Sequence, residues 1–171
     1  GATSVRVPWR DLLDPFQRKR LEMLQSEGVQ LIATYLEPRI TSLPELIEAN
    51  IDLIQNWEIQ IPGTSLPSDD TIPVIKRCED LAELSLCPII SNERVPGKQH
   101  LRTRTGYRIE ELNDLNTHLQ NSDVHLNRAL CRIPPNESPW SFVQTVNQLT
   151  FSHIAHIDLS LELYTQDDCA N

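Results

Sequence analysis

Apolar residues recur at helical spacing along most of this chain. The most regular stretch runs from Thr105 to Ile133 and is marked by leucines seven residues apart: Leu112, Leu119 and Leu126. Leu115 occupies the second heptad position between the first two. A stripe that repeats in this way is typical of an amphipathic helix that packs against another helix. We therefore predict one helix of about eight turns over this stretch.

Three shorter helices are predicted before it. Asp14 followed by Pro15 is typical of a helix start, and Pro38 should end that helix near Glu37. Because only a few residues separate the first two helices, we expect them to form an antiparallel hairpin. The predicted helices span Asp14 to Glu37, Ser42 to Glu58 and Thr71 to Leu86.

The last element can be interpreted in two ways. Apolar residues from Phe142 to Leu149 have helical spacing, whereas those from Ile157 to Leu163 alternate strictly with polar residues, as in a strand. No Gly or Pro follows Pro139 up to residue 165, which favours one long helix. A short strand within residues 151–165 remains the alternative.

These elements predict an all-α fold, a bundle of four to five helices with mainly antiparallel neighbours. Only five glycines and three phenylalanines, beside abundant leucine and isoleucine, also favour helices over a β-sandwich. The length of 171 residues fits one domain. We expect residues 1–171 to form a single helical domain, with an extended arm over 1–13 and a long basic loop over 88–106.

Charge changes this picture at one place. The chain has 15 basic and 24 acidic residues, and its formal charge of −9 does not favour a nucleic-acid binder. One window nevertheless holds five basic residues and no acidic one: Arg94, Lys98, Arg102, Arg104 and Arg108. Guanidinium groups suit carboxylates and phosphates, so we predict a docking site for an acidic or phosphorylated partner or an anionic ligand. The alternative is a solvated loop that partly neutralises the chain's own acidic surface.

Motifs for catalysis are absent from the sequence. It contains no nucleophile elbow, phosphate-binding loop, dinucleotide glycine motif or zinc-protease motif. His153 and His156, with Asp158 beyond them, could in principle hold a metal, but their spacing fits hydrogen-bonded histidines better. We therefore predict no catalytic residue, no metal, no cofactor and no enzymatic activity.

Cysteine usage bears on the compartment. No two of the four cysteines form a CxxC pair, which favours free thiols and an intracellular location in the cytoplasm or nucleus. The sequence contains no run of about 18 apolar residues, so we predict no membrane-spanning helix. Secretion is the alternative, with two disulfides and the glycosylation motif at Asn136. The cysteines are Cys78, Cys87, Cys131 and Cys169.

The function predicted from these features is a non-enzymatic helical interaction, scaffold or dimerisation domain. Its coiled-coil-like helix would present Leu112, Leu115, Leu119 and Leu126 to a protein partner or a second copy, although core packing within one chain needs the same stripe. The alternative is a secreted four-helix ligand resembling cytokines, with disulfides. Such bundles need two long crossovers, whereas the links at Pro38 and Pro134 are short.

Overall fold

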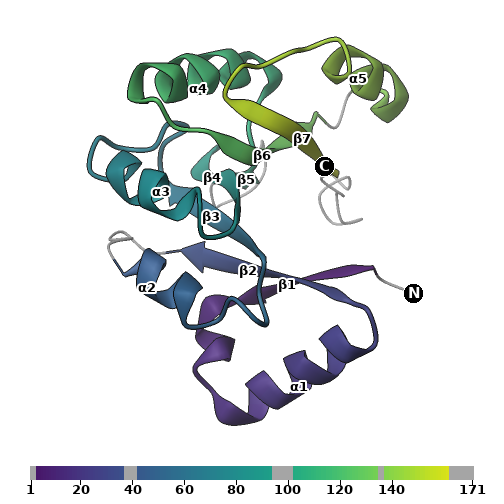
Figure 1. The fold of residues 1–171 in the computed structure, drawn as a ribbon. Helices are drawn as coiled ribbons and strands as arrows, with labels where there is room; N and C mark the ends of the chain where they lie inside the picture. The colour runs from purple at the N-terminus through teal and green to yellow at the C-terminus, as the bar shows by residue number, and fades with distance from the viewer. Residues whose placement is uncertain (1–2, 37–41, 94–101, 135–136, 162–171) are drawn as a thin grey trace.

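The structure, a computed structural model, describes residues 3–36, 42–93, 102–134 and 137–161. Strands and helices alternate along the chain and build one sheet (Figure 1). The fold is therefore α/β, and the all-α bundle predicted from the sequence is wrong. The helical interaction domain, its coiled-coil-like seam and the cytokine-like alternative all required that bundle, and they are corrected with it. Among the described residues, no helix is long and apolar enough to cross a lipid bilayer.

The sheet has seven strands and the chain five α-helices with one short 3-10 helix in the described residues. The strands are β1 (Ser4–Pro8), β2 (Gln30–Leu36), β3 (Asn56–Pro62), β4 (Glu83–Glu93), β5 (Arg102–Thr105), β6 (Leu126–Ile133) and β7 (Ile154–Leu161). The helices are η1 (Trp9–Leu12), α1 (Pro15–Ser26), α2 (Leu43–Glu48), α3 (Ile72–Cys78), α4 (Ile109–Ser122) and α5 (Pro139–Val146).

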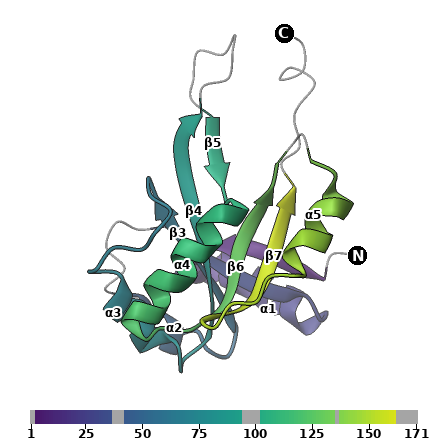
Figure 2. The ribbon, with the colours of Figure 1, turned by 90° about the horizontal axis from the view of Figure 1, so that it is seen from above.

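The parallel strands follow one another in chain order, β1-β2-β3-β4-β6-β7, while β5 pairs antiparallel with β4. A doubly wound sheet would reverse its strand order at a switch point, and this sheet has none. Sequential strands with intervening helices are the arrangement of a (β/α) barrel. Figure 1 shows the strands inside an open arc and the helices around its outside, with β1 and β7 at its two ends. Figure 2 shows β4 and β5 as a projecting hairpin.

The hydrophobic core lies between the outer face of this arc and the helices. Side chains of a strand point alternately to opposite faces, so β2 places Leu31, Ala33 and Tyr35 on the outer face, all at most 3% exposed. Each helix covers them with its own apolar stripe. The buried residues of the five α-helices include Leu21, Leu43, Ile47, Ile75, Cys78, Leu112, Leu115, Leu119, Phe142 and Val146.

The first predicted helix contains a helix followed by a strand. Its start is confirmed, because Asp14 Oδ1 accepts hydrogen bonds from the amides of Phe16 and Gln17 at 2.8 and 3.1 Å. The helix ends early, at Ser26, and is followed by Gly28, whose φ of +81° suits glycine and lets the Val29 amide donate to the Leu24 carbonyl at 3.0 Å. The strand β2 then follows.

The second and third predicted helices are divided in the same way, into α2 with β3 and α3 with β4. Buried parallel strands are short apolar runs, and periodicity alone does not separate such a run from the continuation of a helix. The predicted hairpin of the first two helices is absent for the same reason, because β2 lies between α1 and α2.

The long heptad helix is also shorter than predicted. α4 ends at Ser122, and Asp123 adopts a left-handed conformation with φ of 52°. The Val124 amide then donates to the Leu119 carbonyl at 3.0 Å, which closes the helix end. The rest of the heptad pattern, including Leu126, belongs to the strand β6.

Three further sequence predictions change with the fold. The last element is α5 followed by β7, so the strand alternative was correct and the single long helix was wrong. The predicted arm over 1–13 contains β1 and η1. The predicted loop over 88–106 contains the end of β4 and all of β5, while residues 94–101 lie outside the described part.

Candidate functional site on the inner face of the sheet

Polar residues line the inner face of the arc. Since β-strand side chains alternate, the residues between the buried outer positions point to the inner side. Strand register brings four of them into one row across four neighbouring strands, from β2 to β6: Thr34, Glu58, Ser85 and Arg128. A row of polar side chains on a concave sheet face is unusual for a barrel interior, which bulky branched apolar residues normally fill.

This face encloses a cavity of about 300 Å³, which we call the inner cavity. Each of the six parallel strands supplies a lining residue, in strand order: Arg6, Ile32, Asn56, Ser85, Arg128 and Asp158. The two ends of the arc also interact electrostatically, because the negative charge of Asp158 on β7 helps to raise the pKa of Arg6 on β1. The curvature of the sheet thus brings the first and last strands to one site.

An ion pair fixes one side of the inner cavity. Arg6 Nε donates to Glu58 Oε2 at 2.7 Å, and Gln60 Nε2 donates to Glu58 Oε1 at 3.0 Å. The Glu58 side chain is 3% exposed, whereas that of Arg6 is 48% exposed. Burial opposes protonation of Arg6, but the hydrogen bond to Glu58 and the charge of its carboxylate outweigh this effect and raise the pKa of Arg6. The guanidinium therefore remains charged, held on one edge and open to the cavity.

A second charged group lies near the other end of the arc. Arg128 Nη1 donates to Asp158 Oδ1 at 3.2 Å, and Arg128 Nη2 lies 3.7 Å from Glu83 Oε2. The side chains of Arg128 and Asp158 are 39% and 35% exposed. Both groups can therefore reach a bound molecule while the pair still orients them.

Asn56 adds a buried polar group without a partner. The residue is 7% exposed and lines the inner cavity, yet its Oδ1 atom has no hydrogen-bond partner. Leaving a buried acceptor unpaired costs about 1–3 kcal/mol. Other described side chains also have unpaired buried atoms, but Asn56 is the one among them that lines this cavity. Its Oδ1 atom is thus an acceptor that no described protein group pairs.

The described cysteines do not supply a nucleophile. Burial raises the pKa of Cys87, on β4 next to Glu58, to about 12. Burial likewise raises the pKa of Cys78 and of Cys131 to about 12. All three are free thiols in the described part of the chain, and Cys169 lies outside it. Thiols with such pKa values are protonated and inert at neutral pH.

The leucines predicted to face a partner lie in the core. Leu112, Leu115 and Leu119 on α4 are 0% exposed, and Leu126 on β6 is 2% exposed. The stripe of α4 is used inside the chain, so the core interpretation of this pattern describes the structure.

The predicted Arg-rich site is only partly described. Arg94 and Lys98 lie outside the described residues, and Arg102 belongs to β5. Arg104, 3% exposed at its side chain, donates from both terminal nitrogens to Glu111, at 2.8 and 2.9 Å. Arg108 lies just before α4. Arg104 is therefore engaged in a buried ion pair rather than presented to a partner.

His125 and His153 lie at a second cavity of about 400 Å³, at the amino ends of β6 and β7, whereas His156 on β7 does not line it. The His125 and His153 rings stack there with centroids 4.3 Å apart. Its polar groups satisfy one another, since Glu79 accepts from the His125 amide and Ser152 Oγ lies 2.8 Å from His153 Nδ1. No three metal-binding side chains of the described residues form a group that could hold a metal ion.

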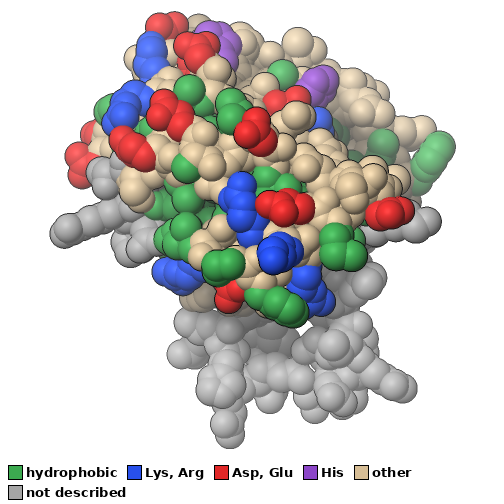
Figure 3. Space-filling view, turned by 60° about the horizontal axis from the view of Figure 1, so that its bottom comes forward, with side chains coloured by type: hydrophobic (Ala, Val, Ile, Leu, Met, Phe, Trp, Pro, Cys, Tyr) green, Lys and Arg blue, Asp and Glu red, His purple; other side chains and the backbone are tan. Residues whose placement is uncertain are grey.

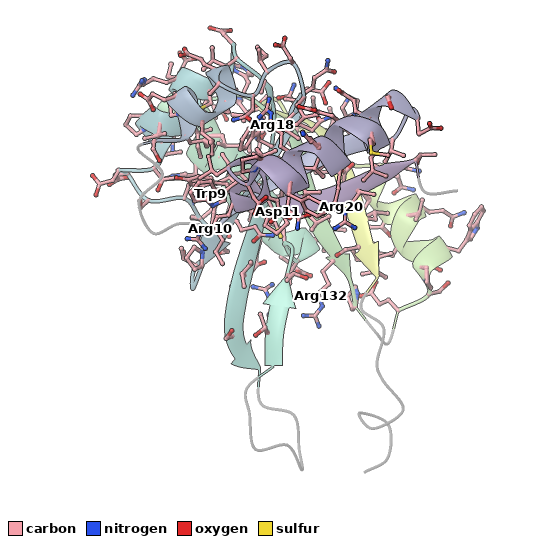
Figure 4. All side chains as sticks on the ribbon, turned by 90° about the horizontal axis from the view of Figure 1, so that it is seen from below. Trp9, Arg10, Asp11, Arg18, Arg20 and Arg132 are labelled. Carbon is pink, nitrogen blue, oxygen red and sulfur yellow. The ribbon has the colours of Figure 1, made fainter. Side chains whose placement is uncertain are left out.

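The outer surface of α1 exposes apolar side chains, but charges interrupt them. Phe16 and Met23 on α1 are each 68% exposed, and Leu13 just before the helix is 62% exposed. Figure 3 shows hydrophobic, basic and acidic side chains intermingled over the face that contains α1. Arg20 lies over the Phe16 ring, whereas Arg18 lies on another side of the helix and bonds Asn50 (Figure 4). This surface lacks a continuous apolar face.

The carboxyl ends of the strands hold a different group of side chains. In (β/α) barrel enzymes the active site lies at this end. Here Trp9 and Arg10 follow β1, with the Arg10 guanidinium 5.2 Å from the Trp9 ring centroid, and the buried Arg132 lies near the end of β6 (Figure 4). None of the three lines the inner cavity.

Of the residues that line the inner cavity, sequence reasoning singled out Asp158 alone, and only as a conceivable metal ligand beside His153 and His156. The available signal was a polar residue at every second position of the apolar runs, as in Arg6 between Val5 and Val7 or Glu58 between Trp57 and Ile59. Comparison with known protein families, with curated proteins and with solved structures finds no match to this chain.

Proposed function

We propose that the chain binds a small polar organic molecule in the inner cavity. The observation that carries this proposal is a single cavity lined from all six parallel strands, with the unpaired acceptor of Asn56 in its wall. A buried unpaired acceptor destabilises the free protein, and a ligand that donates to it removes that cost.

The physical setting suits binding. Strands position side chains more rigidly than loops do, and the ion pairs of Arg6 with Glu58 and of Arg128 with Asp158 orient the two guanidinium groups before a ligand arrives. The volume of about 300 Å³ is at the lower end of the range for ligand pockets. The cavity therefore fits a molecule of metabolite size.

The proposal is restricted to binding. The inner cavity lies toward the amino halves of the strands, because Asn56 begins β3 and Ser85 and Arg128 are the third residues of β4 and β6. Catalytic residues of barrel enzymes lie at the opposite, carboxyl ends. The sequence-based expectation that the chain is not an enzyme stays a prediction.

A cavity-filling variant tests the proposal. Ser85→Phe places a ring in the inner cavity, whereas Thr105→Phe places the same ring at an exposed position on β5. We expect a library of small polar metabolites, screened by saturation-transfer NMR, to contain binders of the wild type and of Thr105→Phe. These binders should lose their signal with Ser85→Phe. Binders that retain their signal with folded Ser85→Phe, or a library without any binder, would contradict the proposal.

A further inference from the structure

We infer that the ligand of the inner cavity is a neutral polyhydroxylated molecule, such as a cyclic polyol or monosaccharide, rather than an anion or a zwitterion. This inference rests on the proposed function, since it names the chemical class of that ligand. It follows from the pairing of the arginines with carboxylates, from the unpaired acceptor of Asn56 and from the polarity of the lining.

The pairing of both arginines with carboxylates disfavours an anion as the ligand. Arg6 pairs with Glu58 at 2.7 Å, and Arg128 pairs with Asp158 at 3.2 Å and lies 3.7 Å from Glu83; of these three carboxylates, Asp158 lines the cavity and the other two do not. Each guanidinium already has a carboxylate partner, so a bound anion would face groups of both signs. The free-energy cost of removing the anion from water would then not be offset by attraction to unpaired positive groups.

The hydrogen-bonding groups favour hydroxyls. Arg6 and Arg128 can only donate, Asp158 can only accept when ionised, and the unpaired Oδ1 atom of Asn56 accepts. A hydroxyl group both donates and accepts, so a ring carrying several hydroxyls can satisfy donors and acceptors that alternate around one cavity. Ser85, on the strand between Asn56 and Arg128, donates its hydroxyl to the Trp57 carbonyl at 3.4 Å and can accept a further hydrogen bond.

The lining also limits apolar parts of a ligand. Of the nine residues that line the inner cavity, Ile32 and Leu159 alone are apolar. Ligand pockets are usually dominated by hydrophobic and aromatic side chains. An amino acid with an apolar side chain would therefore find too little apolar surface here, whereas a polyol requires little.

The test compares three probes by NMR chemical-shift titration of the full chain: myo-inositol, succinate and L-serine. We expect myo-inositol to bind with a Kd on the order of 1 mM, the weak affinity typical of a small ligand. Its Kd should change less than about twofold between about 0.05 and about 0.5 M NaCl, because salt screens charges and the ligand has none. Succinate and L-serine should bind at least about tenfold more weakly.

Substitution of Asn56 separates a binding role from a structural one. Asn56→Leu keeps the size of the side chain but removes the acceptor, so we expect the chain to stay folded and to bind myo-inositol at least about tenfold more weakly. Asn121→Leu makes the same change at an exposed position of α4 and should leave the Kd unchanged.

Two results would overturn the inference in different ways. If succinate or L-serine binds more tightly than myo-inositol, and Ser85→Phe abolishes that binding, the polyol assignment fails and the proposed function stands. If Ser85→Phe leaves the shifts caused by every bound probe and library molecule unchanged, both fail.

Discussion

At the scale of single residues, Gly106 shows how closely the backbone is packed. Its φ is +92°, and a Cβ atom there would lie 3.0 Å from the Leu130 carbonyl oxygen and 3.3 Å from the Arg132 amide nitrogen. These two atoms cannot move freely, because they bond the backbone of Tyr107 at 2.7 and 2.8 Å. We predict that Gly106→Ala lowers the free energy of unfolding by about 3 kcal/mol, measured by urea denaturation.

Gly63 is the matched control for this prediction. Its φ of +78° is also in the left-handed region, but no atom lies within 4 Å of the position of a Cβ. Gly63→Ala should therefore cost about 1 kcal/mol, from backbone conformation alone. If both variants lose the same free energy of unfolding, the close backbone contact at Gly106 does not contribute to the cost of a Cβ there.

The ion pair of Glu111 gives a pH dependence. Burial of Glu111 opposes its ionisation, but hydrogen bonds from the Arg104 guanidinium and the Arg108 amide outweigh this and lower the pKa of Glu111. Because the folded pKa is below the unfolded value of 4.5, the stabilisation is present above about pH 4.5 and is lost as pH falls through the lower folded pKa. We predict that, as pH falls through this range, the free energy of unfolding decreases more for the wild type than for Glu111→Gln, as measured by urea denaturation at each pH.

The same variant should also lose stability at pH 7, by roughly 3 kcal/mol, because it leaves Arg104 buried without its charged partner. Glu45→Gln is the control, since the Glu45 and Arg77 side chains form an ion pair that is 63% and 60% exposed. Its unfolding at pH 7 should differ much less from that of the wild type. If Glu111→Gln and Glu45→Gln lose similar free energy of unfolding at pH 7, Arg104 and Glu111 do not form a buried ion pair.

At the scale of elements, the stripe of α4 is a core element. Leu115 is 0% exposed, whereas Phe16 on α1 is 68% exposed. We predict that Leu115→Ala lowers the free energy of unfolding by about 3 kcal/mol through the cavity it leaves, while Phe16→Ala changes it by less than about 0.5 kcal/mol. Sedimentation should show the same oligomeric state for Leu115→Ala and the wild type. Lost association with unchanged stability would instead mean that this stripe faces a partner.

The start of a helix could be predicted from the sequence, whereas the ends of the helices could not. The start of α1 was predictable, because Asp14 and Pro15 act through local hydrogen bonding and a fixed φ. The helix ends were not, because Gly28 and Asp123 lie inside the predicted helices over Asp14 to Glu37 and Thr105 to Ile133, although each adopts a positive φ that stops a helix. Once those stops were missed, the following strands were interpreted as further helical turns.

The inner cavity could not be predicted even from correct elements. Arg6 and Asp158 are 152 positions apart, and only the order and register of the strands bring them to one site. The alternation that marks an inner face is present in β3, where Asn56 and Glu58 flank the apolar Trp57. It covers only a few residues, and such short runs were interpreted as the ends of helices.

At the scale of the whole molecule, the proposed binding function depends on the curvature of the sheet. Six parallel strands in chain order form an open arc, and that arc places Arg6 from its first strand and Asp158 from its last at one cavity. The helices lie around the outside of the arc (Figure 1), and all six parallel strands contribute apolar side chains to the buried core. The inner face is thereby left free to carry polar groups, which a sheet covered on both sides could not keep open to a ligand.

A crystal structure grown with myo-inositol would test the claim that the inner cavity binds a neutral polyol. We predict density for the ring in the inner cavity, with hydroxyl oxygens within hydrogen-bond distance of Asn56 Oδ1, Arg6 and Arg128. Density for myo-inositol only at another surface, or a cavity in which Asn56 Oδ1 accepts from a protein group, would contradict the claim.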